Sequence, residues 1–182
     1  LFRSAAGIKT LGYIYTSNED NSASALSLVK KGCKEAGINL VTQSITKSDE
    51  VKQAAEAIVN RVDGIYLSTD NTVFSAIASL VNVFGKAKKP IFSGDVTAAK
   101  EGGIFMASGF NYYKAGRATG EMVVKILKGA KPASLPVKFM TDPSDSDFLI
   151  DLDSAKNCEI SIDQKYIDSA NFIYQNGKLS EK

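Results

Sequence analysis

The chain has 182 residues, of which 44% are hydrophobic and 23% charged, the composition of one globular domain with a substantial core. Its formal net charge is +2 and its basic residues are scattered, so neither nucleic acid nor an anionic membrane is expected as the main partner. It has no histidine and two cysteines, Cys33 and Cys158, which excludes a Ser-His-Asp or Cys-His catalytic arrangement and gives no zinc-binding spacing.

Apolar runs alternate with helical patterns over the first 110 residues. Such alternation predicts right-handed βαβ units, and therefore an α/β fold with a Rossmann-like parallel sheet flanked by helices. Strands are predicted at residues 8–15, 38–45, 63–68, 90–93 and 103–108. Helices are predicted between them at 26–36 with Gly37 as C-cap, after Ser48 as N-cap with an apolar face at 51–59, at 73–84 and at 96–101.

The pattern changes after residue 110. A long helix is predicted at residues 112–128, where Gly129 ends it, and a linker follows at 131–136. The remaining predicted segments are a strand at 137–141, a polar turn at 143–147, a strand at 148–152, short helices at 153–157 and near 163–169, and an apolar run at 172–174.

Short polar side chains follow the predicted strands. Ligands of open parallel sheets bind beyond the carboxyl ends of the strands, where helix N-termini favour a carboxylate or a similar anion. This pattern suits a small polar ligand, and the alternative is that these residues only cap helices and form Asx-turns. They are Ser17, Asn18, Asn21 and Ser22; Thr69, Asp70, Asn71 and Thr72; Ser93, Gly94 and Asp95; and Ser108, Gly109, Phe110, Asn111 and Tyr112.

Three other uses of such a sheet fit the sequence poorly. The loop after the first strand has no glycine and no P-loop occurs, so both nucleotide-binding motifs are absent. Asp70 stands where a response-regulator receiver is phosphorylated, but Tyr15 and Thr16 stand where a receiver needs an acidic pair, and Ser108 stands where it needs a lysine. Asp70 and Asp95 could form an acid/base pair, but no histidine or metal set supports catalysis. No enzyme and no cofactor are therefore expected.

Three stretches and a short motif carry a family resemblance: KTLGYIY at 9–15, VDGIYLSTDNTV at 62–73, GFNYYKAGRATGEM at 109–122 and ILKGAKP at 126–132. They resemble the substrate-binding proteins of the tryptophan/tyrosine-type ABC transporter family, which have the type I periplasmic binding protein fold. The resemblance covers roughly residues 8–175. It implies two Rossmann-like lobes joined by a three-strand hinge, with the ligand in the cleft between them and closure by hinge bending.

The resemblance also implies a domain arrangement. Residues 8–110, completed by 147–175, correspond to the C-terminal lobe, and 132–146 to a linker and hinge crossing. The helix within 111–131 is expected to pack on an N-terminal lobe that is absent here, so its apolar stripe would need that lobe or a dimer mate as partner. The predicted stripe is Ala115, Ala118, Met122 and Ile126.

By resemblance, the chain is a solute-binding component of an ABC importer that delivers an amino acid or similar small molecule to a permease. Asp70 and Asn71 are expected at the polar head of the ligand, and Tyr112 or Phe110 against an apolar part. The alternative is a non-transport ligand sensor or interaction module built from the same lobe. The ligand-binding positions implied are Asn18, Ser22, Asp70, Asn71, Thr72, Ser93, Asp95, Asn111 and Tyr112.

The implied location is periplasmic or extracytoplasmic, and anchoring as a lipoprotein is compatible with it. The sequence has no run of 18 apolar residues and no recognisable signal peptide, and it starts at Leu1 without an initiator methionine, so a trimmed or processed fragment is expected. Cys33 lies on the apolar face of a predicted helix and is expected to be a buried thiol, although a Cys33–Cys158 disulfide stays open.

Overall fold

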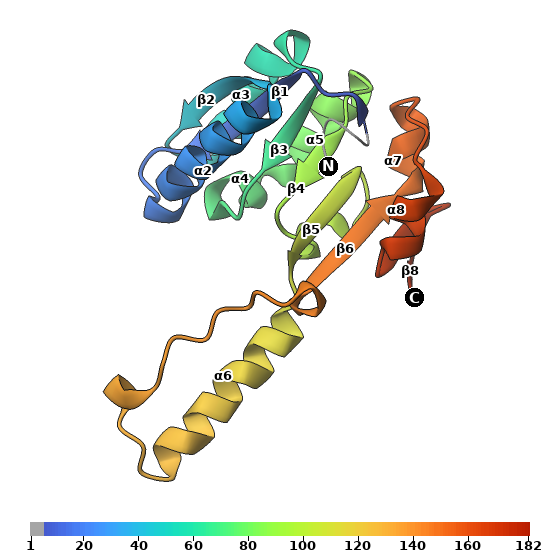
Figure 1. The fold of residues 1–182 in the computed structure, drawn as a ribbon. Helices are drawn as coiled ribbons and strands as arrows, with labels where there is room; N and C mark the ends of the chain where they lie inside the picture. Colours follow the sequence, from blue (N-terminus) through green and yellow to red (C-terminus); the bar gives the residue numbers. More distant parts are fainter. Residues whose placement is uncertain (1–5) are drawn as a thin grey trace.

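The computed structural model describes residues 6–182 and shows a mixed eight-stranded sheet with helices on both faces (Figure 1). The strand order is β2-β1-β3-β4-β5-β6-β7-β8. The strands are β1 (Thr10–Thr16), β2 (Asn39–Ile45), β3 (Gly64–Leu67), β4 (Ile91–Ser93), β5 (Met106–Phe110), β6 (Ser146–Asp151), β7 (Phe172–Gln175) and β8 (Lys178–Glu181). β1 to β5 are parallel, β6 runs antiparallel to β5 and parallel to β7, and β8 runs antiparallel to β7. The predicted α/β class is confirmed.

The helices occupy the connections that the sequence indicates. They are α2 (Asp20–Ala36), α3 (Val51–Ile58), α4 (Asn71–Ser75), α5 (Ile77–Lys86), α6 (Tyr112–Leu127), α7 (Leu152–Asn157) and α8 (Gln164–Ser169). Short 3-10 turns lie at Ser48–Glu50, Val59–Arg61, Thr97–Ala99, Pro132–Ser134 and Pro143–Asp145. Gly37 follows α2 with φ 64°, the left-handed conformation predicted for this C-cap.

Five local features differ from the sequence predictions, and one is that the helix expected at 96–101 is only a 3-10 turn, Thr97–Ala99. The helix expected at 73–84 is divided into α4 and α5 at Ala76, and residues 137–141 form no strand. β8, which was not predicted, pairs with β7 at the edge of the sheet. Ser48 lies inside a 3-10 turn instead of capping a helix; the Glu50 carboxylate accepts the backbone N–H of Thr46 at 2.7 Å at this point.

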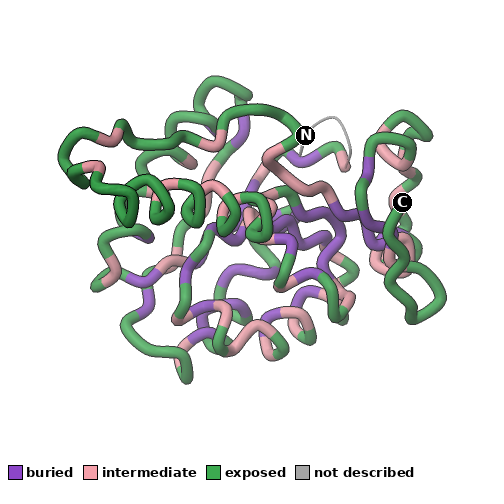
Figure 2. The backbone as a smooth tube through the Cα atoms, turned by 90° about the horizontal axis from the view of Figure 1, so that it is seen from below, coloured by how far each residue is buried: buried purple, intermediate pink, exposed green. Residues whose placement is uncertain are grey.

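Two apolar clusters, one on each face of the sheet, form the core. Figure 2 shows buried backbone concentrated in the strands, because side chains of a central strand alternate between the two clusters. In the first, α3, α4 and α5 cover Ile14, Ile65, Leu67, Ile91 and Leu149. In the second, α2, α7 and α8 pack near Leu11, Phe92, Met106, Ile150 and Ile173.

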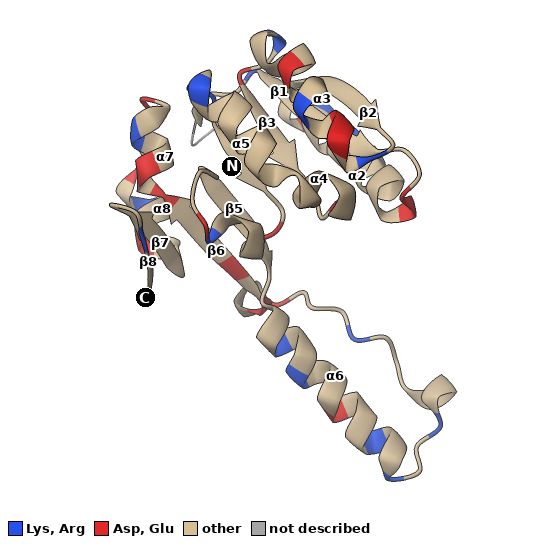
Figure 3. Ribbon diagram, turned by 180° about the vertical axis from the view of Figure 1, so that it is seen from behind, with Lys and Arg blue, Asp and Glu red and all other residues tan. Residues whose placement is uncertain are grey.

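Residues 111–145, here called the arm, leave the sheet as α6 and return as an extended segment (Figure 1). α6 has no buried residue, and most charged side chains of the arm's first thirty residues are basic (Figure 3). The apolar stripe predicted on α6, which includes Ala118 and Met122, is only partly exposed to solvent. These two residues face residues 135–138 across a hollow of about 220 Å³. The more exposed apolar side chains are Tyr113 (74%), Val124 (48%) and Leu127 (81%).

Both cysteines are free thiols, so the Cys33–Cys158 disulfide left open by the sequence does not form in this structure. Burial raises the pKa of Cys33, and it raises the pKa of Cys158 to about 11. Both thiols are therefore protonated and weakly nucleophilic near neutral pH. None of the helices in residues 6–182 is long and apolar enough to cross a membrane.

Gly64 is required by close packing, and replacing it with alanine is expected to destabilise the fold. A Cβ there would lie 2.8 Å from the Pro90 carbonyl oxygen and 3.1 Å from the Ile8 Cδ1. We expect Gly64→Ala to lower the free energy of unfolding by about 1–3 kcal/mol in urea denaturation. Gly32→Ala is the control, because a Cβ on this α2 glycine meets nothing within 4 Å; it should instead stabilise by about 0.5–1 kcal/mol. Equal effects would contradict the packing explanation.

Candidate functional site

The polar loops after β1, β3, β4 and β5 lie at one edge of the sheet because these strands are parallel. We call this edge the crest and define it as residues 16–22, 68–72, 93–97 and 108–112. The crest contains all nine positions predicted to bind ligand, but the structure gives those side chains different environments.

Asp70 is the centre of a buried hydrogen-bond network at the crest. Asp70 is 1% exposed, and its side chain caps the N-terminus of α4. One carboxylate oxygen accepts from the Thr16 hydroxyl (2.7 Å) and the Val73 N–H (3.0 Å). The other accepts from the Thr16 N–H (2.8 Å) and the Ser22 hydroxyl (2.6 Å). These four donors use all four acceptor sites of the carboxylate.

The charge of Asp70 is stabilised within the chain. Burial alone would raise the pKa of this carboxyl, but the hydrogen bonds from Ser22, Val73 and Thr16 outweigh it and hold the pKa below the ordinary value. Ser22 is itself 0% exposed and also accepts the Thr16 N–H at 3.0 Å. Asp70 and Ser22 therefore join the ends of β1 and β3, and they present no free acceptor to a ligand.

Glu19, which the sequence did not single out, joins the first two loops. Its carboxylate accepts the Thr72 N–H at 3.2 Å and the Thr72 hydroxyl at 2.5 Å. Asn21 donates to the Thr69 carbonyl oxygen at 2.9 Å beside this contact. Thr72 is thus held within the chain. A contact between residues 53 apart leaves no local pattern, so the sequence carried no signal for it.

The third loop holds Asp95 through its neighbours. The Ser93 hydroxyl accepts the Asp95 N–H (3.0 Å) and donates to the Asp95 carbonyl (2.9 Å), so buried Ser93 shapes the turn. The N–H and hydroxyl of Thr97 both donate to one Asp95 carboxylate oxygen. Gly109 allows β5 to pass close by, because a Cβ there would lie 2.4 Å from the Gly94 carbonyl oxygen.

Asn111 and Tyr112 begin the arm. Asn111 caps α6 by accepting the Lys114 N–H at 2.9 Å, and its side-chain amide donates to Asp147 at 3.0 Å. The Tyr112 hydroxyl donates to the second Asp95 carboxylate oxygen at 3.0 Å. Partial burial, and then the Asp95 carboxylate, raise the pKa of the Tyr112 phenol, so it stays a donor at neutral pH.

The predicted site residues therefore divide into two groups. Ser22, Asp70, Thr72, Ser93 and Asn111 make hydrogen bonds within the chain that shape the crest. Asn18 and Asn71 are exposed, and their side chains make no hydrogen bond within residues 6–182. Asp95 is half-buried, and Phe110 and Tyr112 are 53% and 56% exposed, so these three also face solvent.

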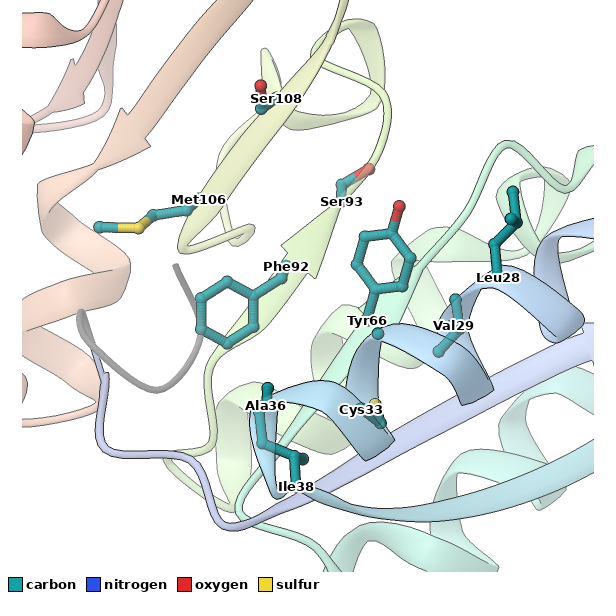
Figure 4. Close-up of a pocket in the computed structure, with 11 residues that line it drawn as sticks. Leu28, Val29, Cys33, Ala36, Ile38, Tyr66, Phe92, Ser93, Met106 and Ser108 are labelled. Carbon is teal, nitrogen blue, oxygen red and sulfur yellow. The ribbon is translucent and has the colours of Figure 1, made fainter.

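An apolar groove of about 430 Å³ lies beside the crest on the α2 face of the sheet (Figure 4). α2 supplies Leu28, Val29 and Cys33, and the strands supply Tyr66, Phe92 and Met106. Its polar side chains are concentrated near the crest end, so the groove suits an apolar surface better than an amino-acid head group. The sequence did not predict the groove, since it depends on how α2 packs against strand residues that are distant from it in the chain.

No metal centre is found among residues 6–182, where no three acidic or cysteine side chains come together in a way that could hold an ion. The crest therefore offers hydrogen-bonding groups, one partly open carboxylate and two exposed aromatic rings. Such groups can orient a small molecule that carries both polar and apolar parts.

Comparison with known proteins gives consistent matches. A family model described as ABC transporter substrate binding protein matches residues 3–172. The tyrosine-binding protein of Clostridioides difficile (strain R20291) is 26% identical over 166 residues, which cover 91% of this chain and 46% of that protein. The chain thus spans about half the length of the curated relative it matches.

Solved structures show the same fold. A conserved domain protein from Vibrio cholerae has a TM-score of 0.85 at 30% identity, over 96% of this chain and 57% of that one. An ABC domain in complex with L-Trp from Streptococcus pneumoniae also has a TM-score of 0.85, at 29% identity over 94% and 58%. A ligand-free, open substrate binding protein with adhesive properties from Clostridium difficile has a TM-score of 0.69, at 30% identity over 90% and 54%.

Replacing Asp70 with asparagine tests the buried network. Asparagine cannot accept four hydrogen bonds, so we expect Asp70→Asn to lower the free energy of unfolding by about 2–4 kcal/mol at pH 7. The depressed pKa of Asp70 contributes stability above the unfolded-state pKa, and this is lost as the pH falls through the folded-state value. Acid unfolding of the variant should therefore be less steep below about pH 4.

The control for this measurement is Asp163→Asn at the exposed start of α8, where asparagine can still cap the helix. It should change the free energy of unfolding by less than about 0.5 kcal/mol. If the two variants unfold alike in urea at pH 7, the Asp70 network does not have the role assigned to it.

Proposed function

Because this chain belongs to the family of ABC transporter substrate-binding proteins, we propose that it forms the ligand-capturing lobe of a solute-binding protein for an amino acid or a similar small molecule. Family membership identifies a binding protein rather than an enzyme. The relatives support the ligand class, because one is named a tyrosine-binding protein and a similar structure holds L-Trp.

The crest is the observation that carries this proposal. Asn18 and Asn71 offer unused amide groups, Asp95 offers a carboxylate, and Phe110 and Tyr112 offer aromatic surface. A polar head with an aromatic or apolar side chain matches this combination. Asp70 supports the site from beneath by fixing the ends of β1 and β3, so the ligand's head group is assigned to its exposed neighbour Asn71 and to Asp95.

A second lobe is proposed to complete the cleft. In this proposal residues 8–110, completed by 147–175, are the C-terminal lobe. The helix within 111–131 would pack on the second lobe, and 132–146 would be the linker and hinge crossing. The outgoing and returning segments of the chain lie side by side where the arm meets the sheet. Phe110 pairs with Ser146, and the Asn111 N–H donates to the Asp145 carbonyl at 2.9 Å. Adjacent segments of this kind support a hinge at this position.

Delivery of the ligand to an ABC permease is proposed from the family relationship. The protein would act outside the cytoplasmic membrane, and a lipid anchor is compatible with this role. In the open form the crest would collect ligand, and the permease would recognise the closed form.

Ligand binding can be tested by thermal unfolding in the presence of single amino acids. A ligand that binds only the folded chain raises its melting temperature, and at a hundredfold excess over Kd it contributes about 2.7 kcal/mol. We expect an aromatic amino acid to raise the melting temperature and an equal concentration of a sugar to leave it unchanged. A full amino-acid panel without any shift would contradict binding by this chain.

The exposed face of α6 predicts self-association when no second lobe covers it. We expect the chain to form dimers or larger species in light scattering after size exclusion, and Val124→Lys combined with Leu127→Glu to shift it toward monomer. Lys125→Glu is the control, because it changes charge on the same helix and leaves its apolar face intact. A wild-type chain that stays monomeric at high concentration would contradict the need for a partner at this face.

A further inference from the structure

We propose that Asp95 is the receptor for a ligand ammonium group and that this group displaces the Tyr112 hydroxyl from the Asp95 carboxylate. The inference rests on the proposed function, and it specifies that the ligand carries a primary amine. It assigns Tyr112 a second part in binding, as the group that competes with the ligand for Asp95.

Asp95 combines a fixed, half-buried position at the crest with unused hydrogen-bonding capacity. Asp70 has four donors and is 1% exposed, so it has no acceptor site left. Glu19 accepts both donors of Thr72 through one oxygen and the Asn21 amide at 3.4 Å through the other. Asp20 is exposed, and no hydrogen bond within residues 6–182 fixes its carboxylate. At Asp95 one oxygen accepts both donors of Thr97, whereas the other accepts only the Tyr112 hydroxyl. That second oxygen retains an acceptor site toward solvent.

The position of Asp95 is fixed before any ligand arrives. Ser93 holds both its N–H and its carbonyl, and Thr97 holds one carboxylate oxygen. The close approach of Gly109 leaves only 3.2 Å between a hypothetical Cβ there and the Asp95 Cα. A carboxylate held in this way loses little conformational entropy on binding, which favours recognition of a small ligand.

Asp95 has no cationic partner among residues 6–182. The ion pairs formed within residues 6–182 do not include Asp95, and the groups that donate to its carboxylate are the neutral N–H and hydroxyl of Thr97 and the hydroxyl of Tyr112. An ammonium group would form a stronger, charge-assisted hydrogen bond than the phenol it replaces. The exposed Tyr112, whose hydroxyl reaches Asp95, has a ring that can contact the apolar part of an aromatic amine, and exposed Phe110 lies two residues before it in the chain.

The exchange would also affect the arm. Among residues 6–182, the Tyr112–Asp95 bond connects α6 to the β4 loop, whereas Asn111 and Lys114 bond to the returning segment and the start of β6. Displacing the Tyr112 hydroxyl removes the first connection and leaves the others in place. Ligand binding would therefore release the beginning of α6 from the β4 loop, at the point proposed as the hinge.

Matched ligands and variants test the proposal by isothermal titration calorimetry of this chain. The ligands are L-tryptophan and indole-3-propionic acid, which differ only in the amine. We expect L-tryptophan to bind at least about tenfold more tightly, and Asp95→Asn to abolish that preference without weakening indole-3-propionic acid. Asparagine can still accept from Thr97, so the loop should remain folded, which a thermal unfolding curve checks.

Tyr112→Phe distinguishes competition from a purely structural role. It removes the hydroxyl and keeps the ring, so we expect L-tryptophan to bind about threefold to tenfold more tightly and indole-3-propionic acid to bind unchanged. Tyr113→Phe is the matched control on the neighbouring, 74% exposed tyrosine. If Tyr112→Phe changed only the stability of the fold, L-tryptophan would not bind more tightly.

The outcomes separate the two proposals. If wild-type chain binds neither L-tryptophan nor any other amino acid, the proposed function fails for this chain. If it binds L-tryptophan and indole-3-propionic acid equally, the function stands and the ammonium role of Asp95 is wrong. If the preference depends on Asp95 but Tyr112→Phe behaves like Tyr113→Phe, the displacement of Tyr112 is wrong.

Discussion

The buried carboxylate of Asp70 determines the shape of the ligand-facing edge. A charged group can stay in the interior only when hydrogen bonds replace its water, and here Thr16, Ser22 and Val73 supply them. Since these donors come from β1, α2 and α4, one side chain fixes three elements at the edge of the sheet. Asn18 lies in the loop after β1 and Asn71 begins α4, and this network positions the backbone at both places without using their side chains.

Sequence reasoning predicted the features that local pattern determines. Apolar runs and helical patterns were sufficient to predict β1 to β4, α2 and α3 from the sequence, because buried parallel strands and amphipathic helices repeat their patterns over short distances. The family resemblance and the absence of enzymatic motifs are consistent with the family match. The crest was also placed correctly, since the ends of parallel strands share one edge.

Features that depend on distant residues were not accessible in the same way. Asp70 and Asp95 look alike in sequence, as acids that follow strands, yet Asp70 is saturated by four donors, whereas one oxygen of Asp95 accepts only the exposed Tyr112 hydroxyl. The Glu19–Thr72 contact and the pairing of β8 with β7 likewise depend on tertiary packing. The ligand-binding roles of the nine predicted residues remain predictions, and the structure distinguishes which of them have groups to offer.

The form of the arm has a mechanical consequence. α6 contains 16 residues and is therefore about 24 Å long, and it is joined to the sheet at one end. A rotation of about 10° at residues 110–111 would move its far end by about 4 Å, roughly the diameter of a methyl group. A shift of Tyr112 by less than the length of a hydrogen bond would thus be amplified along the rigid helix. The C-terminal end of α6 would move furthest.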